Sequence, residues 1–376
     1  MTEIGVGLIG TGFMGKAHAL AYRNAKAIMG DLPDVRMELL AEMPEARALE
    51  MAAQFGFAKA TANWRDLLAD PSIQIISITT PNGLHREIAL AALAAGKHVW
   101  CEKPMALTLE DAKDMAAAAA KAGLATQLGY NYIANPAFTH AVRLVEAGEI
   151  GRVVHVRGWA DEDYQADPSL HWTWRAKSAE AGLGVLGDIG CHLFSLLTGL
   201  VGPLDSVVGE IETIHKTRPL PDGKGSAAVE NEDAATALLT FESGVKGVMM
   251  ISRSAWGRKS RLGFEVHGTK GMLIYDQERM NELQLFRNQG DKATQGFTTI
   301  LTAPEHPPYG QFCPAPGHQL GFNDLKVIEL SGFLRAIRDK IRPSLDFAAG
   351  LEIEKAIHAI ALSAHEHRRV SLREMD

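Results

Sequence analysis

The chain has 376 residues, of which 46% are hydrophobic and 22% charged, and a formal net charge of -7 at pH 7. This composition is typical of a soluble globular protein, and the length predicts two domains. The net negative charge and the lack of basic clusters argue against a nucleic-acid partner. No run of eighteen uninterrupted apolar residues and no signal-peptide pattern occur, so we expect a cytoplasmic protein with no membrane partner.

The first 130 residues alternate short apolar runs with helical patterns. Expected strands cover 4–9, 37–41, 73–79, 98–101 and 124–128, and expected helices cover 13–28, 44–55, 63–69, 83–95 and 108–122. Thr108 is a good N-cap, and glycines at 56, 96 and 123 stand where helices should stop. This alternation predicts an α/β domain built on a doubly wound parallel sheet.

A glycine-rich turn follows the first expected strand. Gly10, Gly12 and Gly15 have the G-x-G-x-x-G spacing and precede a helical pattern that begins at Phe13. The first glycine allows a tight turn, the second lets the backbone approach a pyrophosphate, and the third permits close helix–strand packing. The N-terminus of the following helix also favours phosphate groups. We therefore predict a dinucleotide-binding Rossmann domain over residues 1–130.

Glu42 follows the second expected strand. A carboxylate at this place bonds the adenosine ribose hydroxyls and repels a 2′-phosphate, which favours NAD over NADP. Glu42 lies further from the glycine turn than the usual ~20 residues, because residues 29–34 have the character of an insertion. The alternative interpretation is a solvated surface carboxylate.

Lys103 lies in the run Cys101-Glu102-Lys103-Pro104 at the end of the strand expected over 98–101. Ligands of open parallel sheets bind outside the carboxyl ends of the strands, where this lysine would emerge. A lysine beside a nicotinamide can hydrogen-bond a substrate hydroxyl and stabilise its developing alkoxide. A lone lysine at a strand end can equally be a surface cation.

The second half changes to short alternating runs. Expected strands cover 152–160, 205–213, 234–241, 245–252, 261–267 and 271–276, and helices are expected near 188–199, 324–340 and 350–366. Residues 216–232 and 288–322 are expected to be loops. We predict an α+β domain over 131–376 with a large, mostly antiparallel open sheet.

A glycine-rich approach leads to Asp188 and His192. The two residues are four apart, so a helix beginning near 188 would place them on one face. Hydride abstraction from an alcohol carbon leaves a hydroxyl proton, which a histidine can accept near neutral pH. Asp188 would orient His192 or bind a neighbouring hydroxyl. The alternative is a helix N-cap carboxylate beside a satisfied core histidine.

Cysteines and histidines give no sign of a metal. Three cysteines at wide spacing suit a reducing compartment, and we interpret Cys101, Cys191 and Cys313 as small core residues. The histidines lack compact ligand spacing, and His365 and His367 are typical of an exposed helix end. We expect no bound metal.

Taken together, these motifs make the chain similar to the Gfo/Idh/MocA oxidoreductase family. The resemblance covers nearly the whole chain and includes turns at 80–85, 129–136 and 267–271. Segments 166–175 and 308–310 look like the branch that includes levoglucosan and related sugar dehydrogenases. The resemblance implies an NAD(P)-dependent dehydrogenase with a Rossmann domain and a C-terminal sheet domain, assembled as a homodimer or homotetramer through that sheet.

Lys103, Asp188 and His192 fall on the family's catalytic positions. Many relatives carry an aspartate two residues after the catalytic histidine, where this chain has Phe194, and that departure loosens the substrate assignment. The expected cofactor-binding residues are Gly10, Gly12, Phe13, Met14, Glu42, Thr80, Pro81, Asn82, His85, Glu102, Lys103, Asn131, Trp174 and Arg175. The expected substrate-binding residues are Lys103, Tyr164, His171, Asp188, His192, His318 and Asn323. The long loop over 288–322 can equally have a structural or subunit-contact role.

The predicted reaction is oxidation of a secondary hydroxyl on a small carbohydrate: a sugar, an anhydrosugar, a glycoside or an inositol. Hydride would pass to C4 of NAD and the proton to His192, while Lys103 polarises the same hydroxyl. Two alternatives stay open. One is an NAD-binding regulator without turnover, and the other is an NAD-assisted glycosidase of the same fold.

Overall fold

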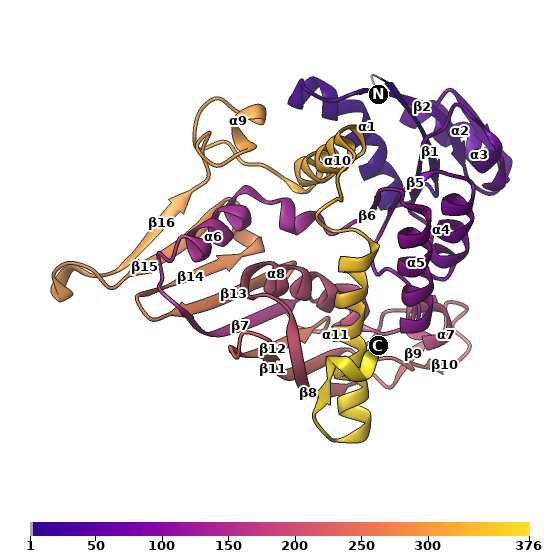
Figure 1. Cartoon of the computed structure of the whole chain (residues 1–376). Helices are drawn as coiled ribbons and strands as arrows, with labels where there is room; N and C mark the ends of the chain where they lie inside the picture. The colour runs from indigo at the N-terminus through magenta and orange to yellow at the C-terminus, as the bar shows by residue number, and fades with distance from the viewer. Residues whose placement is uncertain (1–2) are drawn as a thin grey trace. The chain divides into compact units, whose positions relative to one another are not determined.

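The computed structural model describes residues 3–376, and the chain divides into two compact units (Figure 1). Unit 1 comprises residues up to Ala134 together with Gly321–Leu351, and unit 2 comprises Asn135–Leu320 and Glu352–Asp376. The predicted boundary at residue 130 left 321–351 in the second domain. In the structure this segment packs within unit 1, because the long helix that it carries buries its apolar stripe there.

Unit 1 is built on a six-stranded sheet in the order β3-β2-β1-β4-β5-β6, and every pairing in it is parallel. The strands are β1 (Glu3–Ile9), β2 (Asp34–Ala41), β3 (Lys59–Thr61), β4 (Ile75–Ile78), β5 (His98–Cys101) and β6 (Thr126–Leu128). The predicted parallel sheet is confirmed. The three-residue β3 was missed, since a run of that length carries no periodicity. The strand order reverses between β1 and β4, which is where ligands of such sheets bind.

Helices of unit 1 begin and end where the local sequence signals place them. They are α1 (Phe13–Met29), α2 (Glu45–Phe55), α3 (Arg65–Ala69), α4 (His85–Ala94), α5 (Leu109–Ala122) and α10 (Phe322–Asp339). Thr108 caps α5 by accepting a hydrogen bond from Asp111 N, and Gly56 and Gly123 end α2 and α5 in the left-handed conformation.

Unit 2 contains a nine-stranded sheet in the order β16-β15-β14-β13-β7-β12-β11-β8-β17. Its strands are β7 (Val153–Asp161), β8 (Leu204–Glu212), β11 (Ala234–Phe241), β12 (Lys246–Ser252), β13 (Arg261–Gly268), β14 (Gly271–Asp276), β15 (Glu282–Arg287), β16 (Phe297–Leu301) and β17 (Val370–Ser371). All pairings are antiparallel except that of β7 with β12. The predicted fold class is therefore confirmed.

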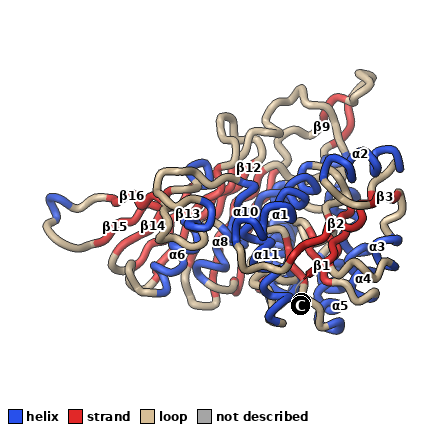
Figure 2. Tube along the Cα trace, turned by 90° about the horizontal axis from the view of Figure 1, so that it is seen from above, coloured by secondary structure: helices blue, strands red, loops and turns tan. Residues whose placement is uncertain are grey.

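Several elements of unit 2 were not predicted. β16 lies inside the segment expected to be a loop at 288–322 and pairs with β15 (Figure 2). Its residues are mostly exposed and two of them are threonines, so the strand has no apolar alternation to reveal it. β9 (Thr217–Pro219) and β10 (Ser226–Ala228) form a small separate sheet in the other expected loop. The short α9 (Tyr309–Phe312) and α6 (Pro136–Glu146), which Asn135 caps, were also missed.

One face of the nine-stranded sheet is covered by helices. α6 packs on β14 and β15, and α8 (Cys191–Val201) packs on β7 and β13. The later part of α11 (Phe347–Glu366) lies under β8, where Ser363 Oγ accepts a hydrogen bond of 2.9 Å from Gly209 N. Side chains on this face, among them Phe264 and Leu273, form the core of unit 2.

Among residues 3–376 one helical stretch, Ser178–Val201, is apolar and long enough to cross a membrane by length and composition. Its apolar window is 78% buried inside the protein. A buried stretch of this kind is typical of a core helix. Of the three cysteines expected in the core, Cys101 and Cys191 are buried, whereas Cys313 is only half-buried.

Candidate active site

The glycine turn has the geometry that its motif predicts. Gly10 adopts φ +96°, and a Cβ there would lie 2.7 Å from Thr79 O. A Cβ on Gly15 would lie 2.3 Å from Gly10 O, so this glycine lets α1 close against the turn. Gly12 is different, since it has φ -68° and nothing lies within 4 Å of its Cβ position. The space over Gly12 is what a pyrophosphate requires.

Glu42 is held at the end of β2 rather than solvated. Its Oε2 accepts hydrogen bonds from Thr11 N at 2.9 Å and Thr11 Oγ1 at 2.6 Å, and its Oε1 accepts one from Met43 N at 2.8 Å. Each carboxylate oxygen still has acceptor capacity for a hydroxyl. The carboxylate is therefore fixed beside the glycine turn, and its contact with the adenosine ribose stays a prediction.

Two predicted cofactor residues present polar atoms that the protein leaves unsatisfied. Thr80 Oγ1 follows β4 and Asn131 Nδ2 follows β6, and neither has a hydrogen-bond partner within residues 3–376. Asn131 is only 1% exposed. Buried polar atoms without partners are rare and are satisfied when a polar ligand binds. With the space over Gly12 and the fixed Glu42, these atoms fit a bound dinucleotide.

His85 holds the two loops that follow β4 and β5. Its side chain is fully buried, and its ring nitrogens lie 3.0 Å from Thr80 O and 3.0 Å from Pro104 O. Burial lowers the pKa of His85, although the backbone contacts raise it. Because both nitrogens face backbone carbonyls, we assign His85 to loop positioning, whereas the sequence predicted a direct cofactor contact.

Glu102 points into the core of unit 1, contrary to the predicted cofactor contact. It is 4% exposed, and its Oε1 lies 2.6 Å from Lys326 Nζ and 2.8 Å from His18 Nε2. Burial alone would raise the pKa of Glu102, but Lys326 and His18 outweigh it and hold the pKa well below its usual range. His18 and Lys326 were not predicted, because their only signal in the sequence is a polar residue inside the apolar stripe of a helix.

Lys103 itself is half-buried directly after β5, where the sequence placed it. Aromatic residues surround the start of α1 in the same unit. Phe13 is 70% exposed and its ring lies 5.3 Å from that of Phe322, which in turn lies 6.3 Å from Tyr132. Asn323 follows Phe322 on the exposed side of α10. Of the remaining predicted cofactor residues, Met14 and Asn82 are half-buried and Pro81 is exposed.

In unit 2 the backbone around Asp188 differs from the predicted helix. Leu186–Gly190 forms one π-helical turn, and α8 begins only at Cys191, so Asp188 and His192 do not share one regular α-helix. The turn is held by Glu232, whose Oε1 accepts a 3.0 Å hydrogen bond from Leu186 N. Single π-turns of this kind are frequent at functional sites.

Asp188 accepts a hydrogen bond from the Tyr164 hydroxyl. Burial and the charge of Asp188 raise the pKa of Tyr164 well above its usual value, so this residue stays a phenol and a donor. The sequence named both residues as substrate contacts without linking them. In the structure Tyr164 orients the carboxylate of Asp188.

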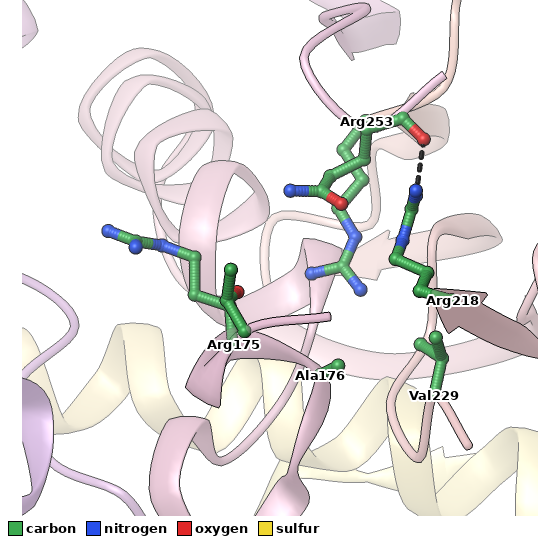
Figure 3. Close-up of a pocket in the computed structure, with 7 residues that line it drawn as sticks. Arg175, Ala176, Arg218, Val229 and Arg253 are labelled. Carbon is green, nitrogen blue, oxygen red and sulfur yellow. Dashed lines mark hydrogen bonds between the residues drawn. The ribbon is translucent and has the colours of Figure 1, made fainter. Parts of the chain in front are cut away.

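Two buried arginines, Arg218 and Arg253, form hydrogen bonds near Tyr164. Arg253 Nε lies 2.8 Å from Asp233 Oδ1, and Arg218 donates to Gln165 O at 2.6 Å. Both line a small pocket, whereas the Arg175 side chain points away from them (Figure 3) and lies 4.5 Å over the Trp174 ring. The full lining comprises Gln165, Thr173, Arg175, Ala176, Arg218, Val229 and Arg253. The two buried arginines donate to protein acceptors, Arg218 to Gln165 O and Asp167 O and Arg253 to Asp233 and Asn231.

The other predicted substrate residues are exposed. His171 lies in the loop before Trp172, and His318 contributes its backbone carbonyl, which accepts a 2.6 Å hydrogen bond from Tyr309 OH. His318 belongs to unit 2 and Asn323 to unit 1. Their roles toward a substrate stay predictions. Within the described part of the chain no three His, Cys, Asp or Glu side chains are arranged to hold a metal ion.

Comparison with known proteins places both halves of the chain. Residues 4–130 match the model of an oxidoreductase family with an NAD-binding Rossmann fold, GFO/IDH/MocA, and residues 138–274 match the GFO/IDH/MocA C-terminal domain. Levoglucosan dehydrogenase of Pseudarthrobacter phenanthrenivorans is 36% identical over 378 residues, which cover 97% of each chain.

Solved structures agree with these matches. Levoglucosan dehydrogenase in complex with NADH and levoglucosan superposes with a TM-score of 0.95 at 36% identity, over 98% of this chain and 99% of that one. An NAD binding oxidoreductase from Klebsiella pneumoniae gives a TM-score of 0.95 at 39% identity, with the same coverage.

Proposed function

Because the chain belongs to the GFO/IDH/MocA family of NAD-binding oxidoreductases, we propose that it is a dehydrogenase that oxidises a secondary hydroxyl of a sugar or anhydrosugar. The observation that carries the substrate class is the full-length similarity to levoglucosan dehydrogenase, whose solved complexes contain NADH with levoglucosan or with L-sorbose. Levoglucosan is therefore the first substrate to test, ahead of inositols, aldoses and glycosides.

The cofactor assignment rests on unit 1. NAD, when bound, supplies the acceptor for the hydride. Gly12 leaves room for its pyrophosphate, Thr80 and Asn131 offer buried polar atoms, and Glu42 would bind the ribose hydroxyls. The same fixed carboxylate would repel a 2′-phosphate, so NADP should be the poorer cofactor.

Each catalytic candidate has a separate task. Lys103 would hydrogen-bond the substrate hydroxyl and stabilise the charge that develops on its oxygen. His192 would take the hydroxyl proton as general base. Asp188, oriented by the Tyr164 hydroxyl, would bind a neighbouring hydroxyl or tune the histidine.

The decisive experiment measures NADH formation at alkaline pH by the purified protein with levoglucosan, inositols, aldoses and methyl glycosides, with NADP in parallel. We expect NADH from an anhydrosugar or sugar and a much lower rate with NADP. Affinity for NADH without turnover of any substrate would favour a regulator. Cofactor that survives gel filtration, with glycoside cleavage and no net NADH, would favour the NAD-assisted glycosidase.

Lys103→Met tests the chemistry within this function. Methionine keeps the length of the side chain and removes the ammonium, so turnover should be abolished while NADH binding, measured by fluorescence titration, stays near normal. Retained turnover in this variant would remove Lys103 from the mechanism.

A further inference from the structure

A buried ionic cluster lies in unit 1 at the carboxyl end of β5. Its charged members are Glu102, which follows β5, and Lys326 and Glu329, which lie one turn apart on α10. None of the three side chains is more than 5% exposed. Buried charges of this kind are costly unless they are paired and hydrogen-bonded, so their partners define the geometry.

The Lys326 ammonium joins two strand ends. Its Nζ lies 2.6 Å from Glu102 Oε1, 3.2 Å from Glu329 Oε2 and 3.3 Å from Gly129 O. Glu102 follows β5 and Gly129 follows β6. One cation therefore ties both loops to α10.

The remaining sides of the cluster are closed by α1 and β5. Trp100 Nε1 donates to Glu329 Oε1 at 2.6 Å, and the His18 ring stacks on the Trp100 ring with centroids 3.5 Å apart. His18 Nε2 lies 2.8 Å from Glu102 Oε1. A polar network satisfied on every side specifies one arrangement of its members.

Lys326 and Glu102 both remain charged in the cluster. Burial would lower the pKa of Lys326, but the two carboxylates raise it, so the ammonium is retained. Burial lowers the pKa of His18 to about 4, and this ring is neutral at physiological pH. Glu102 is thus a carboxylate whose full counter-charge is Lys326.

The cluster is adjacent to the residues that the proposed function needs. Lys103 is the next residue after Glu102, and its backbone N lies 3.4 Å from Glu102 Oε2. A Cβ on Gly129 would lie 2.3 Å from Glu102 Oε1, so this glycine admits the carboxylate. Asn131, with its unsatisfied Nδ2, follows two residues later.

We propose that Lys326 is a positioning residue for the dehydrogenase: through Glu102 it fixes the strand end that presents Lys103 to the substrate. This inference rests on the proposed function, which assigns Lys103 to the substrate hydroxyl. A displacement of about 1 Å in a reacting geometry can cost ~10²-fold in rate, so loss of the clamp should appear in kcat.

The test compares the variants Lys326→Met and Lys326→Met/Glu102→Gln with the wild type in the full chain. The single variant leaves Glu102 as a buried unpaired carboxylate and is expected to lose stability. The double variant removes the Glu102–Lys326 ion pair and keeps the shapes, and Glu329, whose pKa burial raises, can then remain as the neutral acid. The readout is kcat per NADH-binding site, with the number of sites taken from fluorescence titration and levoglucosan, or the best sugar of the screen, as substrate. A merely structural role lowers the number of sites and leaves the rate per site unchanged.

Lys97→Met is the matched control. Lys97 precedes β5 at its other end, is also buried, and donates to Asp70 O and Ile73 O at 2.8 and 2.7 Å. We expect the double variant to lose at least tenfold in kcat per site with an NADH Kd within threefold, and Lys97→Met to keep its rate per site. A double variant within twofold of the wild type, or an equal loss in Lys97→Met, overturns the positioning role. Full activity of Lys103→Met would instead remove Lys103 from the mechanism, whereas a wild type that forms no NADH from any sugar would refute the proposed function itself.

Discussion

Glu329 makes the stability of unit 1 depend on pH. Burial and the charge of Glu102 raise the pKa of Glu329 to about 7, although Lys326 and the Trp100 hydrogen bond lower it. The pKa of an unfolded glutamate is about 4.3, so the folded state binds this proton more tightly than the unfolded state. The stabilisation linked to this proton is present in full below about pH 4 and is lost as pH rises through about 7.

Glu329→Gln should remove this loss, because glutamine resembles the protonated acid and can still accept the Trp100 hydrogen bond. We expect the melting temperature of the variant to match that of the wild type at about pH 4, to exceed it increasingly up to about pH 7, and to keep a nearly constant lead above that pH. Differential scanning fluorimetry across this range measures the difference. The stabilisation linked to His18 and Glu102 is lost as pH falls, which is opposite in direction to that of Glu329. Glu146→Gln, at an exposed glutamate, is the control. If the difference in melting temperature between Glu329→Gln and the wild type is the same at every pH and equals that of the control, the raised pKa of Glu329 is contradicted.

His192 is the candidate general base. It is 8% exposed in the first turn of α8, next to the π-turn that carries Asp188. His192→Asn keeps a polar side chain but removes the general base, so kcat should fall by at least the ~10²-fold typical of this role. The fall in kcat at low pH that protonation of a histidine base causes should also disappear in this variant. If rate and profile both stay unchanged, His192 is a core histidine and another base must be sought.

Substitutions in the glycine turn can separate effects on folding from effects on cofactor binding. Gly12 has room for a Cβ and a φ that alanine adopts, whereas a Cβ on Gly15 would collide with Gly10 O. We expect Gly12→Ala to keep its melting temperature and lose NADH affinity, because the added methyl occupies the space for the pyrophosphate. Gly15→Ala should lose both. NADH titration beside thermal unfolding distinguishes them, and normal NADH affinity in Gly12→Ala would mean that the cofactor does not approach this turn.

Elements with strong local signals were predictable from the sequence. The expected strand over 98–101 and that over 234–241 match β5 and β11, because a short apolar run defines the first and apolar alternation defines the second. The cluster at β5 was not predictable in the same way. The helix expected over 324–340 matches α10 closely, but the partner of Lys326 lies 224 residues earlier in the chain. A lysine in a helical pattern reads as solvated until the fold supplies its carboxylate.

The π-turn before α8 shows the same limit at the candidate site. The pattern over 188–199 predicts a regular helix that begins near Asp188. The turn departs from it because Gly184 packs against Glu232, whose backbone O would lie 2.1 Å from a Cβ on that glycine. Contacts across 46 residues of sequence, such as Leu186 N to Glu232, decide this backbone and leave no local trace.

Segments that pack together in this molecule are not always neighbours in the sequence. Residues 321–351 return to unit 1 after nearly two hundred residues of unit 2. Arg335 on α10 pairs with Asp31 in the segment that the sequence marked as an insertion, with nitrogen and oxygen 2.7 Å apart. Such a return is invisible to composition and periodicity, which assign each segment to its neighbours in sequence. The division of function between domains 1–130 and 131–376 therefore stays a prediction.

The open face of the nine-stranded sheet bears on assembly. Leu238 and Met250 are 56% and 60% exposed, and Leu238 pairs across strands with Val248, which is also exposed. Apolar side chains grouped on one sheet face are typical of a protein interface, which favours the predicted homodimer or homotetramer.

Leu238→Lys/Met250→Lys tests this interface, because two ammonium groups cannot be buried there without partners. Light scattering after gel filtration should show a multiple of the 40.7 kDa chain for the wild type and a smaller particle for the variant, with NADH binding per chain unchanged. Leu49→Lys, at an equally exposed leucine on α2, is the control and should keep the wild-type mass. A monomeric wild type would refute assembly altogether, and a double variant of unchanged mass would show that the subunits meet through another surface.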